Sequence, residues 1–254
     1  MTLAQLPLLA LAGFAAGAVN ALAGGGTLIS FPALLALGLS PVSANITSTV
    51  ALCPGYLGAA LAQRRDLQGQ RTRLSSLLPV AAVGGAGGAV LLLRTDAHFF
   101  ERAVPWLILL ACALLAAQER VRGMLVRRTA HADVVARPSW SWLLIGAGAM
   151  YGGYFGAGMS VILLAALGIA YDDSLVRLNA LKQWLALAAN LTAAVWLAWR
   201  APLDWRVVAV LACSAALGGA WGGRIAGRLS PLMLRRAVVL LGVAIALVYF
   251  WRQR

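Results

Sequence analysis

Charge is scarce in this chain, and it is entirely missing from the first quarter. Only 11% of the 254 residues are charged, 61% are hydrophobic, and no Asp, Glu, Lys or Arg precedes Arg64. A soluble domain must show water a charged face, so this composition excludes one. Several apolar stretches approach the ~20 residues with which a helix crosses a bilayer. The sequence predicts an all-α, polytopic helical membrane protein.

The side chains needed for catalysis within a membrane are also few. The two histidines, His98 and His131, fall between the expected spans, and no Asp or Glu lies in the middle of an apolar segment. A serine nucleophile needs a nearby base, and a metal centre needs clustered ligands. No Gly-Lys-Ser/Thr phosphate loop occurs either. We therefore expect no enzyme, no cofactor and no metal site.

Cysteine contributes only Cys53, Cys112 and Cys213, each alone within an apolar segment. This spacing provides neither a disulfide framework nor a zinc motif. All three are predicted to be small buried hydrophobes.

The formal net charge of +13 comes from arginines in short blocks between apolar segments. At such positions, positive charge sets the orientation of membrane helices and attracts anionic headgroups. Residues 64–73 and 118–138 are the most basic stretches, so we expect both on the cytoplasmic side. We expect membrane lipid, and not nucleic acid, to be the partner of these arginines.

One pattern occurs twice, over residues 13–45 and 148–179. Each copy has glycines four apart, a tight glycine cluster, an apolar run, another glycine, a polar turn and an asparagine. Matches in a fixed order indicate internal duplication. We predict about eight transmembrane helices in two four-helix repeats with interrupted first helices. The repeats cover residues 1–118 and 139–254, and residues 119–138 form a basic cytoplasmic linker.

Four spans in each half would orient both halves alike and place both termini in the cytoplasm. If the interrupted segments are re-entrant, the count changes and the halves become an inverted pair. We expect the parallel arrangement. Paired small residues one turn apart, such as Gly84 with Gly88 and Gly218 with Gly222, predict close helix packing.

The two interruptions form the expected functional centre, although glycines can also simply kink packed helices. Freed N–H groups and half-helix dipoles at such breaks favour an anion. For this reason we expect a bulky residue at Gly25 to be more damaging than one at Gly13. Hydroxyl and amide side chains near each break add donors. The predicted substrate-binding residues are Asn20, Gly24, Gly25, Gly26, Thr27, Asn45 and Ser48 in the first half, and Tyr154, Gly156, Gly158, Ser160, Asn179, Lys182 and Gln183 in the second.

Lys182 lies a few residues inside an apolar segment. An ammonium group at that depth costs up to ~3 kcal/mol on insertion scales. Lys182 therefore faces a cavity, pairs with another group, or snorkels to the interface. If it faces the cavity, it attracts an anion.

The stretch AGGGTLISFPALLALGLSPVSANITS, residues 23–48, has a weaker echo over residues 148–190. It resembles the sulfite exporter TauE/SafE family of bacterial permeases. The resemblance implies a multi-pass inner-membrane carrier for sulfite, sulfonates, sulfoacetate or related small organic acids. The second copy departs from the first, since it lacks the proline after its glycine cluster and has a longer, acidic turn.

We therefore expect a secondary transporter that exports a small anion by alternating access. An anion channel and a non-transporting membrane assembly partner are the alternatives. A homo-oligomer is left open.

Overall fold

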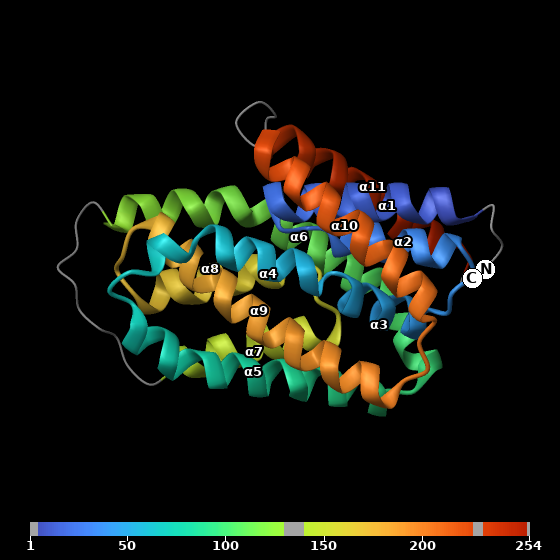
Figure 1. The fold of residues 1–254 in the computed structure, drawn as a ribbon, viewed down its shortest axis with the longest axis horizontal. Coiled ribbons are helices and arrows are strands. Elements are labelled where there is room, and N and C mark those ends of the chain that lie inside the picture. The colour runs from blue at the N-terminus through green and yellow to red at the C-terminus, as the bar shows by residue number, and fades with distance from the viewer. Residues whose placement is uncertain (1–4, 130–139, 226–230, 253–254) are drawn as a thin grey trace.

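The computed structural model describes residues 5–129, 140–225 and 231–252, and within these ranges the chain is built of helices joined by short turns (Figure 1). The helices are α1 (Leu6–Ala23), α2 (Thr27–Ala36), α3 (Pro41–Ala51), α4 (Cys53–Ala62), α5 (Arg71–Arg94), α6 (Ala97–Thr129), α7 (Trp140–Tyr154), α8 (Met159–Ala170), α9 (Leu175–Arg200), α10 (Trp205–Ile225) and α11 (Pro231–Arg252), with a short 3-10 turn, η2 (Arg64–Leu67), after α4.

Long apolar helices with apolar outer faces characterise the described part of the chain. Three segments are long and apolar enough to cross a membrane: Arg71–Arg94, Ala97–Met124 and Trp205–Gly222. Large apolar side chains such as Val83 and Leu143 are exposed on the outside of the bundle. Outward-facing side chains of this kind suit contact with lipid. The prediction of an all-α protein is confirmed for the described residues, and their apolar helices are consistent with a helical membrane protein.

Both predicted interruptions are present, but each segment turns back instead of crossing the molecule. Gly148 and Gly152 of α7 face Ile162 and Met159 of α8, so these two helices run antiparallel. In the first half, Gly26 at the start of α2 lies against Ala16 of α1. The start of α1 and the α2–α3 turn lie at the same end of the molecule, on the right of Figure 1. The segments are helical hairpins.

Left-handed glycines end the first helix of each hairpin. Gly24 has φ +76°, and its N–H donates to the carbonyls of Val19 and Asn20. Gly156 has φ +80° and its N–H donates to the Tyr151 carbonyl. This cap satisfies the last carbonyls of a helix, and glycine adopts the required conformation without a steric penalty.

The hairpins change the predicted orientation of the two halves. Each hairpin is followed by three crossings, formed by α3–α4, α5 and α6 in the first half and by α9, α10 and α11 in the second. Because three is odd, the second half is inverted relative to the first (Figure 1). The expected parallel arrangement of four-span halves is therefore wrong, and the re-entrant alternative describes the fold.

The described residues that flank the linker and those nearest the termini consequently lie at opposite ends of the molecule. α1 begins and α11 ends at one end, whereas α6 ends and α7 begins at the other (Figure 1). The end of α6 and the start of α7 therefore do not share an end of the molecule with the start of α1 and the end of α11, whereas the sequence placed the linker and both termini on one side; which side is cytoplasmic stays a prediction. The predicted linker begins at residue 119, but α6 continues as a helix to Thr129. The rest of the linker, including His131, lies outside the described residues.

The halves interlock through their glycines. α1 packs along α10, where a Cβ at Gly218 would collide with the Phe14 carbonyl. α7 packs along α5, where a Cβ at Gly153 would collide with the Gly85 carbonyl. The first helix of each hairpin thus rests on the double-glycine helix of the other half, as expected for small residues that let backbones approach.

The cysteines are all free, and they do not share one environment. Cys112 is buried and Cys53 is partly buried, as predicted, but Cys213 is exposed on α10. The apolar surroundings of Cys213 in the sequence reflect the outer, lipid-facing side of a membrane helix and not the protein interior.

Candidate functional site

The two breaks meet face to face in the interior. A Cβ added to Gly24 would lie 3.3 Å from the Ser160 Cβ, and one added to Gly156 would lie 3.9 Å from the Thr27 Oγ1. Each break therefore lies against the first turn of the returning helix of the other hairpin. The first N–H groups of a helix lack intrahelical partners and carry its positive dipole end. The starts of α2 and α8 thus bring hydrogen-bond donors to one place.

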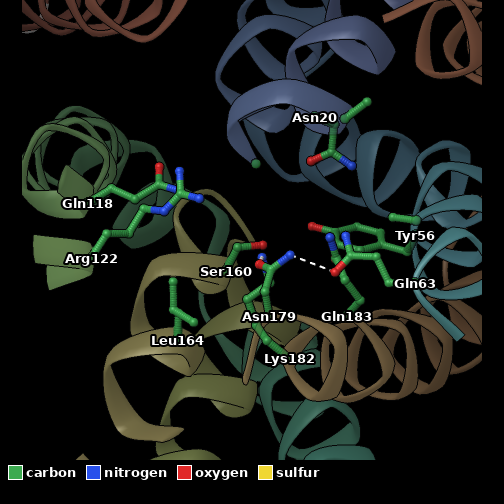
Figure 2. A pocket seen from close by; sticks show the side chains of 13 residues that line it. Asn20, Tyr56, Gln63, Gln118, Arg122, Ser160, Leu164, Asn179, Lys182 and Gln183 are labelled. Carbon is green, nitrogen blue, oxygen red and sulfur yellow. Dashed lines mark hydrogen bonds between the residues drawn. The ribbon is translucent and has the colours of Figure 1, made fainter. Parts of the chain in front are cut away.

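A polar cavity of about 100 Å³ adjoins this meeting point (Figure 2). It lies toward the end of the bundle that carries Arg64, Arg65, Arg71 and Arg73, here called the basic end. Its walls include the end of α4 and the start of α9, which both lie at this end. Its volume accommodates several waters or a small oxyanion. Six of the predicted site residues line it: Asn20, Gly24, Ser160, Asn179, Lys182 and Gln183.

Lys182 is the buried cation of this cavity. Its side chain is only 6% exposed, and Nζ donates a 2.8 Å hydrogen bond to Asn179 Oδ1. Asn179 Nδ2 in turn donates to Gln63 Oε1 at 2.7 Å, the dashed line in Figure 2. Among the described residues, no ion pair includes Lys182. Lys182 therefore faces the cavity, held by neutral oxygen and without an acidic partner.

Arg122 supplies a second positive charge from the opposite wall. It projects from α6 beside Gln118, across the cavity from Tyr56 and Gln63 (Figure 2). Its nearest ion-pair partner, Glu119, is 3.9 Å away, which is long for a charge-assisted bond. The described lining contains no Asp or Glu. Two cations, several amides and the hydroxyls of Ser160 and Tyr56 make the cavity electropositive.

Four polar or charged lining residues were not predicted from the sequence: Tyr56, Gln63, Gln118 and Arg122. Gln118 and Arg122 are one helical turn apart and therefore share a face of α6. Arg122 falls within the predicted linker, residues 119–138, and Gln118 is the last residue of the predicted first repeat, because charge increases there. Tyr56 lies on α4 and Gln63 follows the last residue of that helix, seven residues later, and this spacing is the signal that could have identified them.

Three predicted glycines serve packing and do not line the cavity. Gly25 lies against Leu115, and Gly158 lies against Leu114, both on α6. Gly26 packs directly against the backbone of Ala16. They hold the hairpin tips in place.

The remaining predicted residues lie on the side of the breaks that faces away from the cavity. Their contacts close the protein interior on that side. Asn45 Nδ2 donates a 2.7 Å hydrogen bond to the Tyr154 carbonyl, joining α3 to the second hairpin. Ser48 is hydrogen-bonded to Ser30 of α2. Thr27 is buried there, and the rings of Phe31 and Phe155 meet edge to face at 5.3 Å. The two hairpins and α3 are thus sealed together away from the basic end.

Ion pairs tie the halves together at the basic end. Asp173 accepts hydrogen bonds from Arg73 at 2.6 Å and Arg177 at 2.9 Å, and the Arg73 guanidinium lies over the Tyr171 ring. Partial burial alone would raise the pKa of Asp173. The bonds from Arg73, Arg177 and the Ser174 N–H outweigh it and hold the pKa below the ordinary 3.8. The carboxylate is a fixed anchor between α5 and α9.

An all-helical membrane bundle with two re-entrant hairpins meeting at a polar cavity is the architecture of a membrane transporter. The profile of the sulfite exporter TauE/SafE family matches residues 9–249, and the chain belongs to this family. The resemblance seen in residues 23–48 is confirmed.

Individual relatives carry transporter names. The chain is 27% identical over 241 residues to "Probable membrane transporter protein" of Haemophilus influenzae, covering 93% of this chain and 91% of the relative. It is 25% identical over 246 residues to "Probable membrane transporter protein ORF9" of a Sinorhizobium species, covering 95% and 91%. A shorter match, 30% over 96 residues, covers 37% of this chain and 35% of "Probable membrane transporter protein YfcA" of Escherichia coli K12.

Proposed function

We propose that this protein is a secondary carrier that exports a small anion such as sulfite, a sulfonate or a related organic acid. The observation that carries the proposal is Lys182, an ammonium group buried in the cavity with no acidic partner among the described residues. A buried charge without a counter-ion is costly. A bound anion is the counter-ion that would relieve this cost, and membership of the sulfite exporter family supports an oxyanion.

The cavity offers a complete set of donors for such an anion. Lys182 and Arg122 supply charge from opposite walls, and Ser160 supplies a hydroxyl at the start of α8. The amide nitrogens of Asn20 and Gln183 add neutral donors. Charge-assisted hydrogen bonds to oxyanions are roughly twice as strong as neutral ones. An oxyanion held by several of them loses its water without a large penalty.

The inverted halves supply a route to alternating access. The cavity lies toward the basic end, while the Asn45–Tyr154 and Ser30–Ser48 bonds seal the other side of the breaks. In inverted repeats, exchange of the two half-conformations turns an inward-facing site into an outward-facing one. In this carrier, that exchange would break these two bonds and close the walls around Lys182.

We further propose that the basic end is cytoplasmic in the bacterial inner membrane. Loops rich in Lys and Arg remain on the cytoplasmic side. Arg64 and Arg65 lie in the α4–α5 connection at this end, and Arg71 and Arg73 lie in the first turn of α5. Both termini then face the periplasm, opposite to the expectation from a four-span half. The cavity faces the cytoplasm, which suits loading of a substrate for export.

Flux measurements on purified protein in liposomes test this function. Vesicles loaded with sulfite, a small sulfonate or acetate would be diluted into anion-free buffer, and efflux would be followed over time. The proposal predicts saturable efflux of at least one anion, with competition between related anions. Linear, non-saturable efflux would indicate a channel instead. An absence of efflux for every anion, from protein that is folded, would favour an assembly partner.

A further inference from the structure

A second basic site lies on the outer surface of the bundle, between α6 and α11. These helices pack closely and antiparallel where Cys112 meets Gly242 and the Val239 carbonyl. Toward the basic end they leave a groove of about 390 Å³. Its walls are formed by Ala116, Glu119, Arg235, Arg236, Val239 and Leu240. The groove is distinct from the transport cavity, although α6 contributes to both.

Arg235 is buried in this groove with most of its donors unused. Its exposed fraction is 2%, and Nη1 donates a 2.7 Å hydrogen bond to Glu119 Oε1. Its Nε and Nη2 are buried and have no hydrogen-bond partner within the described residues. A buried guanidinium with unpaired N–H groups is costly, because each group has lost its water and gained nothing. A ligand with several hydrogen-bond-accepting oxygens would satisfy these N–H groups.

Charge and polarity in the groove are ordered along the helix axes. Arg235 and Arg236 against Glu119 leave a net charge of +1 by simple count of these lining residues. One turn further from the basic end, the walls become apolar, with Ala116 on α6 and Leu240 on α11. A basic head at the membrane surface above an apolar slot is complementary to a phospholipid and not to a soluble anion.

We propose that this groove binds an anionic phospholipid, with an acyl chain along the apolar walls and its phosphate beside the exposed Arg236, where a shift of the covering side chains brings it onto Nε and Nη2 of Arg235. The guanidinium fork matches two phosphate oxygens. Basic pockets between membrane helices on the cytoplasmic side are known to hold anionic headgroups. Arg236 is exposed beside the groove and adds attraction for an anionic lipid over a zwitterionic one.

Lipid binding to the delipidated full-length protein in detergent tests the proposal without reference to transport. Three probes would be titrated separately: phosphatidylglycerol, phosphatidylcholine and inorganic phosphate. Bound lipid would be counted by native mass spectrometry, and the unfolding midpoint would be measured in parallel. Phosphatidylglycerol should bind saturably and raise the midpoint, and the other two probes should not. Equal effects of phosphatidylcholine or of free phosphate would overturn the proposal.

Three variants locate the site. Arg235→Gln should weaken phosphatidylglycerol binding by about tenfold or more, since it removes a charge-assisted pair of bonds. Arg206→Gln, exposed at the opposite end, should bind as the wild type does. Wild-type affinity in folded Arg235→Gln protein would rule the site out.

Glu119→Gln keeps the test decisive even if the Arg235 variant does not fold. Removing this carboxylate frees Nη1 and takes a negative charge away from the phosphate position. Phosphatidylglycerol affinity should therefore rise several-fold, on the order of the gain from one charge-assisted bond. If the Arg235–Glu119 pair is only structural, this variant will lose stability while its lipid affinity stays unchanged or falls, and that result would contradict the proposal.

Discussion

Gly24 and Ser160 face each other at the centre of the protein, with 3.3 Å between the Ser160 Cβ and the place where a Gly24 Cβ would be. They come from opposite, inverted halves of the chain. The contact brings the tip of the first hairpin to the start of α8, beside the cavity that holds Lys182. Transport in this account depends on the tips remaining this close.

Replacing Gly24 by alanine should therefore damage both stability and transport. Gly24 has φ +76°, a conformation that costs an L-residue about 1–2 kcal/mol. The new methyl group would also press on Ser160. The unfolding midpoint in detergent and anion efflux should both fall. Gly87→Ala is the control, because nothing lies within 4 Å of its added Cβ. Equal behaviour of the two variants would contradict this role for Gly24.

Gly13→Ala should destabilise the protein more than Gly25→Ala, the reverse of what the sequence suggested. A Cβ at Gly13 would lie 2.9 Å from the Leu211 carbonyl oxygen, and backbone cannot move aside without separating α1 from α10. A Cβ at Gly25 would meet only the Leu115 Cδ2 at 3.1 Å, which belongs to a flexible side chain. Unfolding midpoints of the two variants decide the order. A larger loss for Gly25→Ala would show that its environment is stiffer than the structure indicates.

Asp173→Asn should lower stability by about 1 kcal/mol, the scale of a partly exposed ion pair. The pKa of Asp173 is depressed in the folded state by Arg73, Ser174 and Arg177 against the opposing effect of burial. Above pH 3.8 the carboxyl is ionised in both folded and unfolded states, so the stabilisation is complete. It is lost as the pH falls through the depressed folded value.

Denaturant unfolding of wild type and Asp173→Asn would therefore be compared across pH. The difference in the free energy of unfolding should be constant from pH 7 to pH 5 and should shrink only below pH 3.8. A difference that already vanishes at pH 5 would show that the three donors do not act on this carboxylate.

The orientation of the fold can be tested with single cysteines in a background lacking Cys53, Cys112 and Cys213. Arg71 lies at the basic end and Arg206 at the opposite end, and both are exposed. A membrane-impermeant thiol reagent applied to intact spheroplasts should label Arg206→Cys directly. It should label Arg71→Cys only after the membrane is opened. The opposite pattern would place the basic end outside.

Local chemistry made much of this fold predictable. Glycine is the residue that adopts a left-handed helix cap, so Gly24 and Gly156 marked the breaks at the correct positions. For a lysine inside an apolar segment, the sequence left a cavity, a pairing group and snorkelling to the interface open, and Lys182 lines a cavity. The role of these residues in binding stays a prediction.

The direction of the chain after each break was not predictable in this way. Whether α2 continues or turns back depends on the contact of Gly26 with Ala16 and on the packing of α1 along α10. Both involve tertiary partners that no local pattern specifies. Arg122 was missed for a related reason: a basic helical extension and a basic loop have the same composition. Its place at the cavity is set by the packing of α6.

Equilibrium binding of a labelled small sulfonate or sulfite to the purified protein tests the central claim most directly. Wild-type protein should bind saturably, and Lys182→Met should lose about tenfold or more in affinity while remaining folded, because it removes a charge-assisted bond from a buried site. Arg122→Gln should also bind less tightly, and Arg206→Gln should match the wild type. Unchanged affinity in folded Lys182→Met protein would contradict the account.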